Sequence, residues 1–292
     1  MDQQEWLAHQ FEEQRPHLRA VAYRMLGSLS EADDAVQDAW LRLGRADTRE
    51  VENLRAWLTS IVARVALNML RARKTRRELP LDVHVPDPIV DPADGIDPEH
   101  EAVLADSVGL ALLVVLETLS PAERLAFVLH DMFGVPFEEI APILERSPEA
   151  TRQLASRARR RVRGAPVPDA DLTAQWEVVD AFLAAVRDGD FDALVAVLDP
   201  EVVLRGDAGS LSGLSRRVQG AKAVAGQALY WSQSGLITQR ALVNGAPGTV
   251  SIRDGKPFSV GAFTVKNGKI VEIDFLADPE RIAQLDLTLL SD

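Results

Sequence analysis

An arginine-rich segment near the middle of the chain carries side chains suited to binding nucleic acid. Guanidinium groups bind phosphates and also the O6 and N7 atoms of guanine. Within residues 147–162 a Ser-Pro pair predicts a helix start, and the short helix expected at residues 137–144 gives helix-turn-helix spacing. The second helix could lie in a major groove; a solvated, arginine-rich surface helix is the alternative. The polar candidates for reading DNA are Ser147, Arg152, Gln153, Ser156, Arg157 and Arg160.

A second basic segment lies between residues 54 and 77, where an apolar helical pattern runs into a cluster of basic side chains. Basic residues that follow an aromatic-anchored helix could track a phosphate backbone. The polar loop before it, residues 45–53, could receive an unstacked base. The candidates for these contacts are Arg45, Asn53, Arg55, Trp57, Arg64, Asn68, Arg71, Arg73, Lys74, Arg76 and Arg77.

A third polar surface is acidic. Residues 31–43 have helical spacing, with Asp34, Gln37, Asp38 and Arg42 on one face. That face could bind a basic helix of a partner, although the polar face of a helix is most often simply solvated.

Groups typical of catalytic and metal sites are sparse. The chain has no cysteine, and its histidines are scattered without the spacing of metal ligands. No histidine follows His130, so the C-terminal half cannot build a His–Asp acid/base pair. A buried Asp acting alone is the remaining route to a catalytic base. We therefore expect no metal, no cofactor and no enzymatic activity.

The elements that hold these surfaces fall into more than one domain. The chain has 292 residues, 47% of them apolar, which suits about two domains. Only six of the 18 glycines lie in residues 1–164 and twelve follow, while Pro166 and Pro168 come directly after Gly164. We therefore place a domain boundary near Gly164, with a mostly helical region before it.

An acidic linker separates the two basic helices. From residue 82 to residue 106 the chain has eight acidic residues, four prolines and neither Lys nor Arg. This segment contributes to the formal net charge of −12, which at face value argues against a nucleic-acid partner. The net charge of the whole chain hides two basic surfaces, which become clear when the charge is counted segment by segment.

Beyond residue 173 the pattern changes to mixed helices and strands. Asn-Gly or Asp-Gly pairs at 244–245, 254–255 and 267–268 predict tight hairpins. We therefore expect an α+β domain with a curved antiparallel sheet. The expected helices are residues 176–188, 191–198 and 221–232, and the expected strands are residues 202–204, 237–243, 249–253, 258–266 and 269–275.

Two sequence blocks resemble the domains of extracytoplasmic-function (ECF) sigma factors. Residues 5–77, with AYRMLGSLSEADDAVQDAWLRL and LRAWLTSIVARVALNMLRARKTRRE, are similar to the region-2 domain. Residues 108–163, with LETLSPAERLAFVLHDMFGVPFEEIAPILERSPEATRQLASRARRRV, are similar to the region-4 domain. The resemblance implies two all-α sigma domains, a region-2 helical bundle and a region-4 helix-turn-helix.

The same resemblance implies partners for the three polar surfaces. It implies binding to core RNA polymerase, through the β′ clamp helices and the β flap, and to promoter DNA. The loop at residues 45–53 would capture a flipped base near −10, residues 64–77 would touch adjacent duplex, and residues 147–160 would read the −35 element. The implied contacts to the β′ clamp helices are Asp33, Asp34, Gln37, Asp38 and Trp40.

Residues 174–290 resemble a SnoaL-like, NTF2-like cone, and the whole arrangement is similar to the ECF41-type group that includes the mycobacterial SigJ proteins. The group implies that the cone regulates the sigma domains in cis through the linker, with no separate anti-sigma protein required. A small-molecule ligand in the cone stays open, and we expect a cytoplasmic protein with no membrane partner. The implied regulatory residues are Val85, Pro86, Asp87, Pro88, Asp207, Gly209, Asp278 and Pro279.

The expected organisation has five segments, and two other functions stay open beside it. One alternative is a ligand-sensing helix-turn-helix regulator that does not bind core polymerase, and the other is a SnoaL-like enzyme with a helical appendage. Promoter-dependent transcription with added core polymerase separates the sigma factor from the regulator, and turnover that survives in residues 169–292 alone would favour the enzyme. The segments are a region-2 domain at 1–78, a linker at 79–107, a region-4 domain at 108–164, a second linker at 165–173 and the cone at 174–292.

Overall fold

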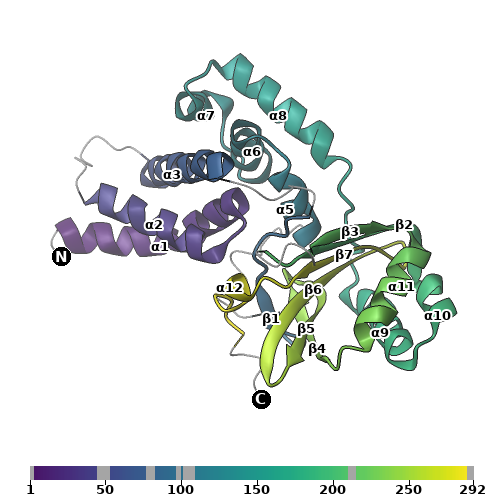
Figure 1. Ribbon diagram of the computed structural model, residues 1–292. Coiled ribbons are helices and arrows are strands. Elements are labelled where there is room, and N and C mark those ends of the chain that lie inside the picture. Colours follow the sequence, from purple (N-terminus) through teal and green to yellow (C-terminus); the bar gives the residue numbers. More distant parts are fainter. Residues whose placement is uncertain are drawn as a thin grey trace. The chain divides into compact units, whose positions relative to one another are not determined.

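The computed structural model describes residues 3–44, 53–76, 83–96, 100, 109–209 and 215–287. The chain divides into two compact units, coloured along the sequence in Figure 1. Unit 1 comprises Met1–Glu78, Pro98–Ala105 and Val115–Gly164, and unit 2 comprises Leu79–Asp97, Asp106–Val114 and Ala165–Asp292. Most of the two predicted sigma domains therefore lies in unit 1, whereas the first part of the acidic linker and the start of the predicted region-4 domain belong to unit 2.

Unit 1 begins with three long helices: α1 (Gln3–Leu26), α2 (Leu29–Leu43) and α3 (Leu54–Arg76). Their apolar faces meet in a core that includes Leu18, Val36 and Val62, all nearly inaccessible to water. Helix α1 continues through Pro16. Proline removes one backbone hydrogen bond of a helix, and packing of α1 against both α2 and α3 keeps the two halves together.

The second half of unit 1 consists of shorter helices. Ser120 and Glu123 cap α6 reciprocally, and Glu145 in the left-handed region (φ 55°) ends α7 and forms the turn before α8. The turn confirms the predicted helix-turn-helix. The elements are α5 (Leu110–Glu117), α6 (Pro121–Phe127), the π-helical turn η1 (Val128–Met132), α7 (Phe137–Leu144) and α8 (Pro148–Val162).

The two helical parts of unit 1 pack against each other. Helix α3 contacts α6 and α7, and α1 contacts η1. At this junction the Arg124 side chain is almost fully buried; its Nη1 donates to Glu117 Oε1 at 2.6 Å and its Nε donates to the Arg24 carbonyl at 3.2 Å. The ring of His17 on α1 lies edge-on to Phe133, 5.4 Å between centroids. The bond from the buried Arg124 to the Arg24 carbonyl thus links the two predicted sigma domains.

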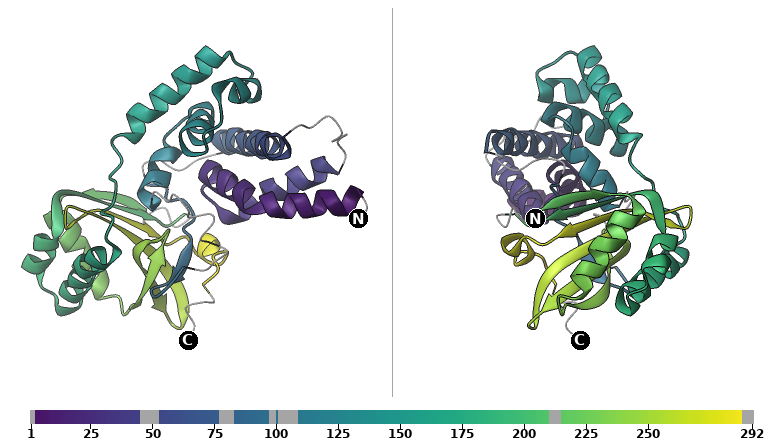
Figure 2. Two further views of the ribbon diagram at one scale, coloured as in Figure 1. Left: turned by 180° about the vertical axis from the view of Figure 1, so that it is seen from behind. Right: turned by 45° about the vertical axis from the view of Figure 1, so that its right-hand side comes forward.

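Unit 2 is built around one curved seven-stranded sheet with the strand order β1-β4-β5-β6-β7-β2-β3 (Figures 1 and 2). The strands are β1 (Val90–Pro92), β2 (Leu198–Asp207), β3 (Arg216–Gln219), β4 (Ile237–Val243), β5 (Ala246–Arg253), β6 (Lys256–Lys266) and β7 (Lys269–Leu276). The helices are α9 (Leu172–Asp188), α10 (Phe191–Val197), α11 (Ala221–Ser232) and α12 (Pro279–Ile282).

The three predicted hairpins form as expected, because Asn244, Asp254 and Asn267 have positive φ and each precedes a glycine that also has positive φ. The sheet is not wholly antiparallel, however. Strand β2 pairs with β7 in parallel, and β1, which comes from the acidic linker, adds to the edge beside β4. The expectation of a wholly antiparallel sheet is wrong for the β2–β7 pair, because turn signals predict the pairing only of strands that are adjacent in sequence.

Helices α9, α10 and α11 cover one face of the sheet (Figure 2). Trp176, Phe182 and Val224 on the helices share a core with Phe263 and Ile273 on the strands. This is the predicted cone architecture, with helices on a curved sheet. No helix among the described residues is long and apolar enough to span a bilayer.

Candidate functional site

The predicted −35 helix, α8, presents its polar residues to solvent. Thr151, Ala155 and Ala158 are buried against the rest of the motif. The hydroxyl of Thr151 donates to the Ser147 carbonyl at 3.0 Å, so this side chain stabilises the start of the helix. The exposed side chains include every candidate on this helix: Ser147, Arg152, Gln153, Ser156, Arg157 and Arg160.

Acidic neighbours hold some of the α8 arginines in place. Arg157 and Arg161 both approach Glu123, and Arg159 pairs with Asp131. Burial alone would raise the pKa of Glu123, but hydrogen bonds from Ser120 and the two arginine charges lower it. A charged carboxylate behind the helix thus orients a basic surface that faces water.

The predicted polymerase-binding face of α2 is partly solvated and partly structural. Asp33, Asp34 and Gln37 are exposed, whereas Trp40 is half-buried with its ring 5.0 Å from that of Phe11. Asp33 accepts from Arg19 at 2.8 Å. Asp38 accepts from Arg42 at 2.9 Å. The exposed Leu41 (52% accessible) extends this face, and sequence reasoning did not single it out.

Helix α3 carries one continuous basic stripe. Arg64, Asn68 and Arg71 are exposed and lie on one side of the helix because they are four and three residues apart. Arg73 is different. Its Nη1 donates to the Leu26 carbonyl at 2.8 Å and its Nε donates to Glu31 at 3.1 Å. Arg73 therefore holds α3 to the preceding helices, and the stripe itself is the better candidate for phosphate contacts.

The start of α3 is anchored locally. Asn53 Oδ1 accepts from the Ala56 amide, which caps the helix. Arg55 donates to His17 Nδ1 at 3.0 Å, and Trp57 is half-buried. Burial and the charges of Arg55 and Arg24 lower the pKa of His17 to about 4. The predictions at Arg45 and Arg77, and the side chains of Lys74 and Arg76, lie outside the described residues.

The linker is held by the C-terminal domain at a site that we call the latch, formed by linker residues 84–87 together with Asp207 and Arg281. Asp207 Oδ2 accepts from the Val85 amide at 3.0 Å, from His84 Nδ1 at 3.0 Å and from Arg281 Nη1 at 2.8 Å. Arg281 also donates to Asp87 Oδ1 at 2.6 Å and to the Val85 carbonyl. One arginine and one aspartate thus bind both the backbone and the side chains of the linker.

Apolar burial and backbone pairing extend the latch along the linker. Val85, Pro86 and Pro88 are buried. Farther on, the Ile89 amide donates to Asn244 Oδ1 at 3.2 Å and its carbonyl accepts from the Asn244 amide at 2.8 Å. This segment continues directly into β1. This part of the acidic linker therefore leads into an edge strand of the sheet.

The remaining predicted regulatory residues help to position the short helix that carries Arg281. Asp278 caps α12, the short helix that carries Arg281, by accepting from the Glu280 and Arg281 amides. Gly209 has a positive φ of 54°, and a Cβ there would lie 1.8 Å from Asp278 Oδ2. Pro279 is the first residue of α12. The structure brings together all eight predicted regulatory residues.

Sequence reasoning left Arg281, His84 and Asn244 out of the candidate set, although Arg281 bonds two groups of the linker, as the predicted Asp207 does. The surplus of acids in the linker is a signal that could have pointed to a basic partner. Burial alone would raise the pKa of Asp207, but bonds from His84 and the Val85 amide and the charge of Arg281 hold that pKa well below its usual range. The latch therefore contains an ionised, fully bonded carboxylate.

A second buried charge cluster lies on the same sheet face. Arg205 donates to Asp274 at 2.8 Å and to Glu272 at 3.0 Å. Burial raises the pKa of Asp274 to about 6, with Arg205 opposing the rise and Glu272 adding to it. Within the described ranges no group of three or more His, Asp or Glu residues could hold a metal ion.

Known protein families match the two helical parts of unit 1 separately. Sigma-70 region 2 matches residues 10–76, and Sigma-70, region 4 matches residues 109–162. The matched ranges contain the α2 and α3 surfaces and the helix-turn-helix, respectively.

Relatives match along nearly the whole chain. The "ECF RNA polymerase sigma factor SigJ" of Mycobacterium tuberculosis is 40% identical over 291 residues, covering 93% of this chain and 92% of the relative. The "Probable ECF RNA polymerase sigma factor SigI" of the same species is 36% identical, covering 96% and 94%. The crystal structure of the M. tuberculosis extracytoplasmic function sigma factor SigJ matches with a TM-score of 0.77 at 36% identity, covering 96% of this chain and 99% of that one. The similarity thus includes the C-terminal unit.

Proposed function

The chain belongs to the extracytoplasmic-function RNA polymerase sigma factors, and we propose that in this member the latch regulates transcription initiation in cis. As an alternative sigma factor it is a transcription initiation factor that works with core RNA polymerase. The observation that carries the proposal is the capture of residues 84–87 by Asp207 and Arg281. The captured segment connects the two sigma domains in sequence, so its release changes how freely they can move apart.

The energetics of the latch suit a regulatory contact. Hydrogen bonds to charged groups contribute roughly 1.5–3 kcal/mol each, and losing one partner leaves the other charge unpaired. Arg281 bonds two carboxylates and one carbonyl. The contact is strong enough to hold the linker and small enough for a competing partner to displace. Regulation of this kind requires no separate anti-sigma protein and takes place in the cytoplasm with the polymerase.

Within this function we propose a role for each exposed surface. The α8 residues Arg152, Gln153 and Arg160 read the −35 element, supported by their exposure on the recognition helix of a helix-turn-helix. The α3 stripe contacts the duplex beside the −10 element through phosphates. The exposed acids of α2 bind the β′ clamp helices, and region 4 approaches the β flap.

The test compares Arg281→Ala with Arg217→Ala in the full-length protein. Arg217 is an exposed arginine of the same domain, and its side chain donates to Gln219. It therefore controls for the loss of a positive charge. Endoprotease Asp-N, which cleaves before aspartate, should cut the linker before Asp87 and Asp91 about tenfold faster in Arg281→Ala.

The same variants are then assayed in run-off transcription with core polymerase. We expect Arg281→Ala to change the yield from a cognate promoter several-fold while Arg217→Ala matches the wild type. Equal linker cleavage and equal transcription in all three proteins would contradict regulation by the latch. Loss of polymerase binding in the double charge reversal Asp34→Lys with Asp38→Lys, with the fold intact, tests the α2 assignment separately.

A further inference from the structure

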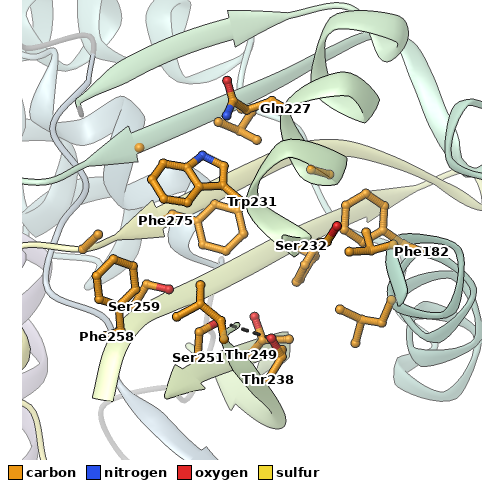
Figure 3. A pocket seen from close by; sticks show the side chains of 18 of the residues that line it. Phe182, Gln227, Trp231, Ser232, Thr238, Thr249, Ser251, Phe258, Ser259 and Phe275 are labelled. Carbon is orange, nitrogen blue, oxygen red and sulfur yellow. Dashed lines mark hydrogen bonds between the residues drawn. The ribbon is translucent and has the colours of Figure 1, made fainter. Parts of the chain in front are cut away.

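The C-terminal domain contains a cavity of about 870 Å³ between α9, α11 and the covered face of the sheet. Figure 3 shows its lining, with side chains from the helices and the strands pointing toward a common space. Cavities that bind drug-sized molecules have volumes of roughly 300–1,000 Å³. The cavity is therefore large enough for a molecule of several rings.

Aromatic rings dominate the wall of this cavity. Phe182 and Trp231 come from the helices, and Phe258, Phe263 and Phe275 come from the strands (Figure 3). Aromatic faces favour flat, apolar partners through stacked and edge-to-face contacts. Most of the hydroxyl groups lie on the sheet wall, at Thr238, Thr249, Ser251 and Ser259, and Ser232 adds one from α11.

One polar group in the wall has an unused donor. Arg216 Nη1 donates to Gln227 Oε1 at 2.7 Å. Because a guanidinium can only donate, this contact fixes the amide orientation and leaves Gln227 Nε2 free. That nitrogen is buried and has no hydrogen-bond partner among the described residues. A buried amide without a partner is costly, so it suits a ligand with an acceptor oxygen.

The cavity and the latch share one piece of backbone. Successive residues of a strand point to opposite faces, and Gly206, Ala208 and Ala277 line the cavity while their neighbours Asp207 and Asp278 form and support the latch. The Ala277 amide also donates to the Asp207 carbonyl at 2.6 Å. A molecule against this wall therefore touches residues adjacent to the groups that hold the linker.

We propose that the cavity binds a flat, largely apolar small molecule with a hydrogen-bond acceptor, and that its binding stabilises the captured linker. The inference rests on the proposed function of the latch. The cavity has its shape while the latch is closed, and a ligand that fits one state better shifts the equilibrium toward that state. The ligand thus acts as an effector of the sigma factor, bound by aromatic rings and oriented by Gln227.

The binding test uses two probes and three variants of the full-length protein. N-phenyl-1-naphthylamine reports an apolar site by fluorescence, and flavone, a flat molecule with one carbonyl, competes with it. Trp231→Ala should weaken both probes about tenfold, as expected for loss of an aromatic wall. Tyr230→Ala is the matched control, because Tyr230 neighbours Trp231 but is 67% exposed and absent from the cavity wall.

Gln227→Glu keeps the size of the side chain and its bond to Arg216 but replaces the free donor with an acceptor. Flavone affinity should fall about tenfold in this variant, while N-phenyl-1-naphthylamine, which has no carbonyl, binds as before. Equal affinity of wild type and both cavity variants for both probes would overturn the site. An equal effect of Gln227→Glu on the two probes would overturn the assigned donor.

The coupling test adds flavone to the Asp-N cleavage assay. Saturating flavone should slow cleavage before Asp87 several-fold in the wild type and in Tyr230→Ala, and have little effect in Trp231→Ala. Flavone that binds without changing cleavage would overturn the coupling. If Arg281→Ala speeds cleavage but flavone leaves it unchanged, only this inference fails; if Arg281→Ala itself has no effect, the proposed function fails.

Discussion

The arginines of α8 and the arginine of the latch differ in what surrounds them. Arg152 pairs with Glu149 while both side chains are more than half exposed. Arg281 is mostly buried and bonds Asp87, Asp207 and a linker carbonyl. An exposed ion pair contributes roughly 0–1 kcal/mol, so Arg152 can exchange Glu149 for a phosphate or a base at little cost. Release of Arg281 removes its positive charge from two carboxylates, Asp87 and Asp207.

This comparison shows that the exposure of an arginine side chain distinguishes a residue that can bind an outside partner from one that holds two segments of the protein together. A residue that must bind an outside partner keeps weak internal contacts, whereas a residue that holds two segments together is buried and fully bonded. Arg73 and Arg124 in unit 1 also hold segments together, since each donates to a backbone carbonyl of α1 and to a carboxylate. Residue type alone does not distinguish the two roles.

The largest expected effect comes from Arg124, the most buried arginine in this comparison. Arg124→Ala removes the charge that pairs with the buried Glu117 and should lower the free energy of unfolding by about 3–5 kcal/mol, measured by urea denaturation. Replacing both partners, in Arg124→Met with Glu117→Leu, should restore most of the loss. If Arg124→Ala is as stable as the wild type, burial does not make this arginine a structural residue.

An intermediate effect is expected at the recognition helix, and on DNA binding only. Arg160→Ala should weaken binding of the polymerase holoenzyme to promoter DNA by about 1–3 kcal/mol and change the free energy of unfolding by less than about 0.5 kcal/mol. Promoter titration by fluorescence anisotropy and urea denaturation measure the two quantities. Arg187→Ala, an exposed arginine of unit 2, is the control. Normal promoter affinity in Arg160→Ala would remove it from the predicted contacts.

A smaller effect distinguishes the two buried carboxylates of unit 2 by pH. The pKa of Asp207 is depressed, so its contribution to stability is complete above about pH 4 and is lost as pH falls further. The pKa of Asp274 is raised to about 6, so the folded state binds the extra proton and stability falls as pH rises from about 4 to 6.

Unfolding by urea between pH 3 and pH 7 checks these two signs. The stability difference between wild type and Asp207→Asn should shrink below about pH 4. The pH slope between about 4 and 6 should become less negative in Asp274→Asn. The groups facing Asp207 are His84 and Arg281, and those facing Asp274 are Arg205 and Glu272. The same slope in wild type and Asp274→Asn would refute the assignment to Asp274.

Local signals determined much of this protein from its sequence. Helical periodicity and the Ser-Pro start predicted α8 and its exposed arginines, and the Asn-Gly and Asp-Gly pairs predicted three hairpins that form with positive φ. These signals depend on residues within a few positions of one another. They predicted the fold class, the helix-turn-helix and the exposed polar surfaces.

Only the tertiary structure decided where the linker lies and which residues hold it. Val85 and Asp207 are 122 residues apart, and Val85 and Arg281 are 196 apart. The pairing of β1 with β4 and the parallel pairing of β2 with β7 also join segments that are far apart in sequence. Such contacts form because burial makes an unpaired charge or backbone group costly, and the burial itself depends on how the whole sheet curves. The sequence therefore predicted that the linker was acidic and extended, and the fold of unit 2 supplied its basic partner.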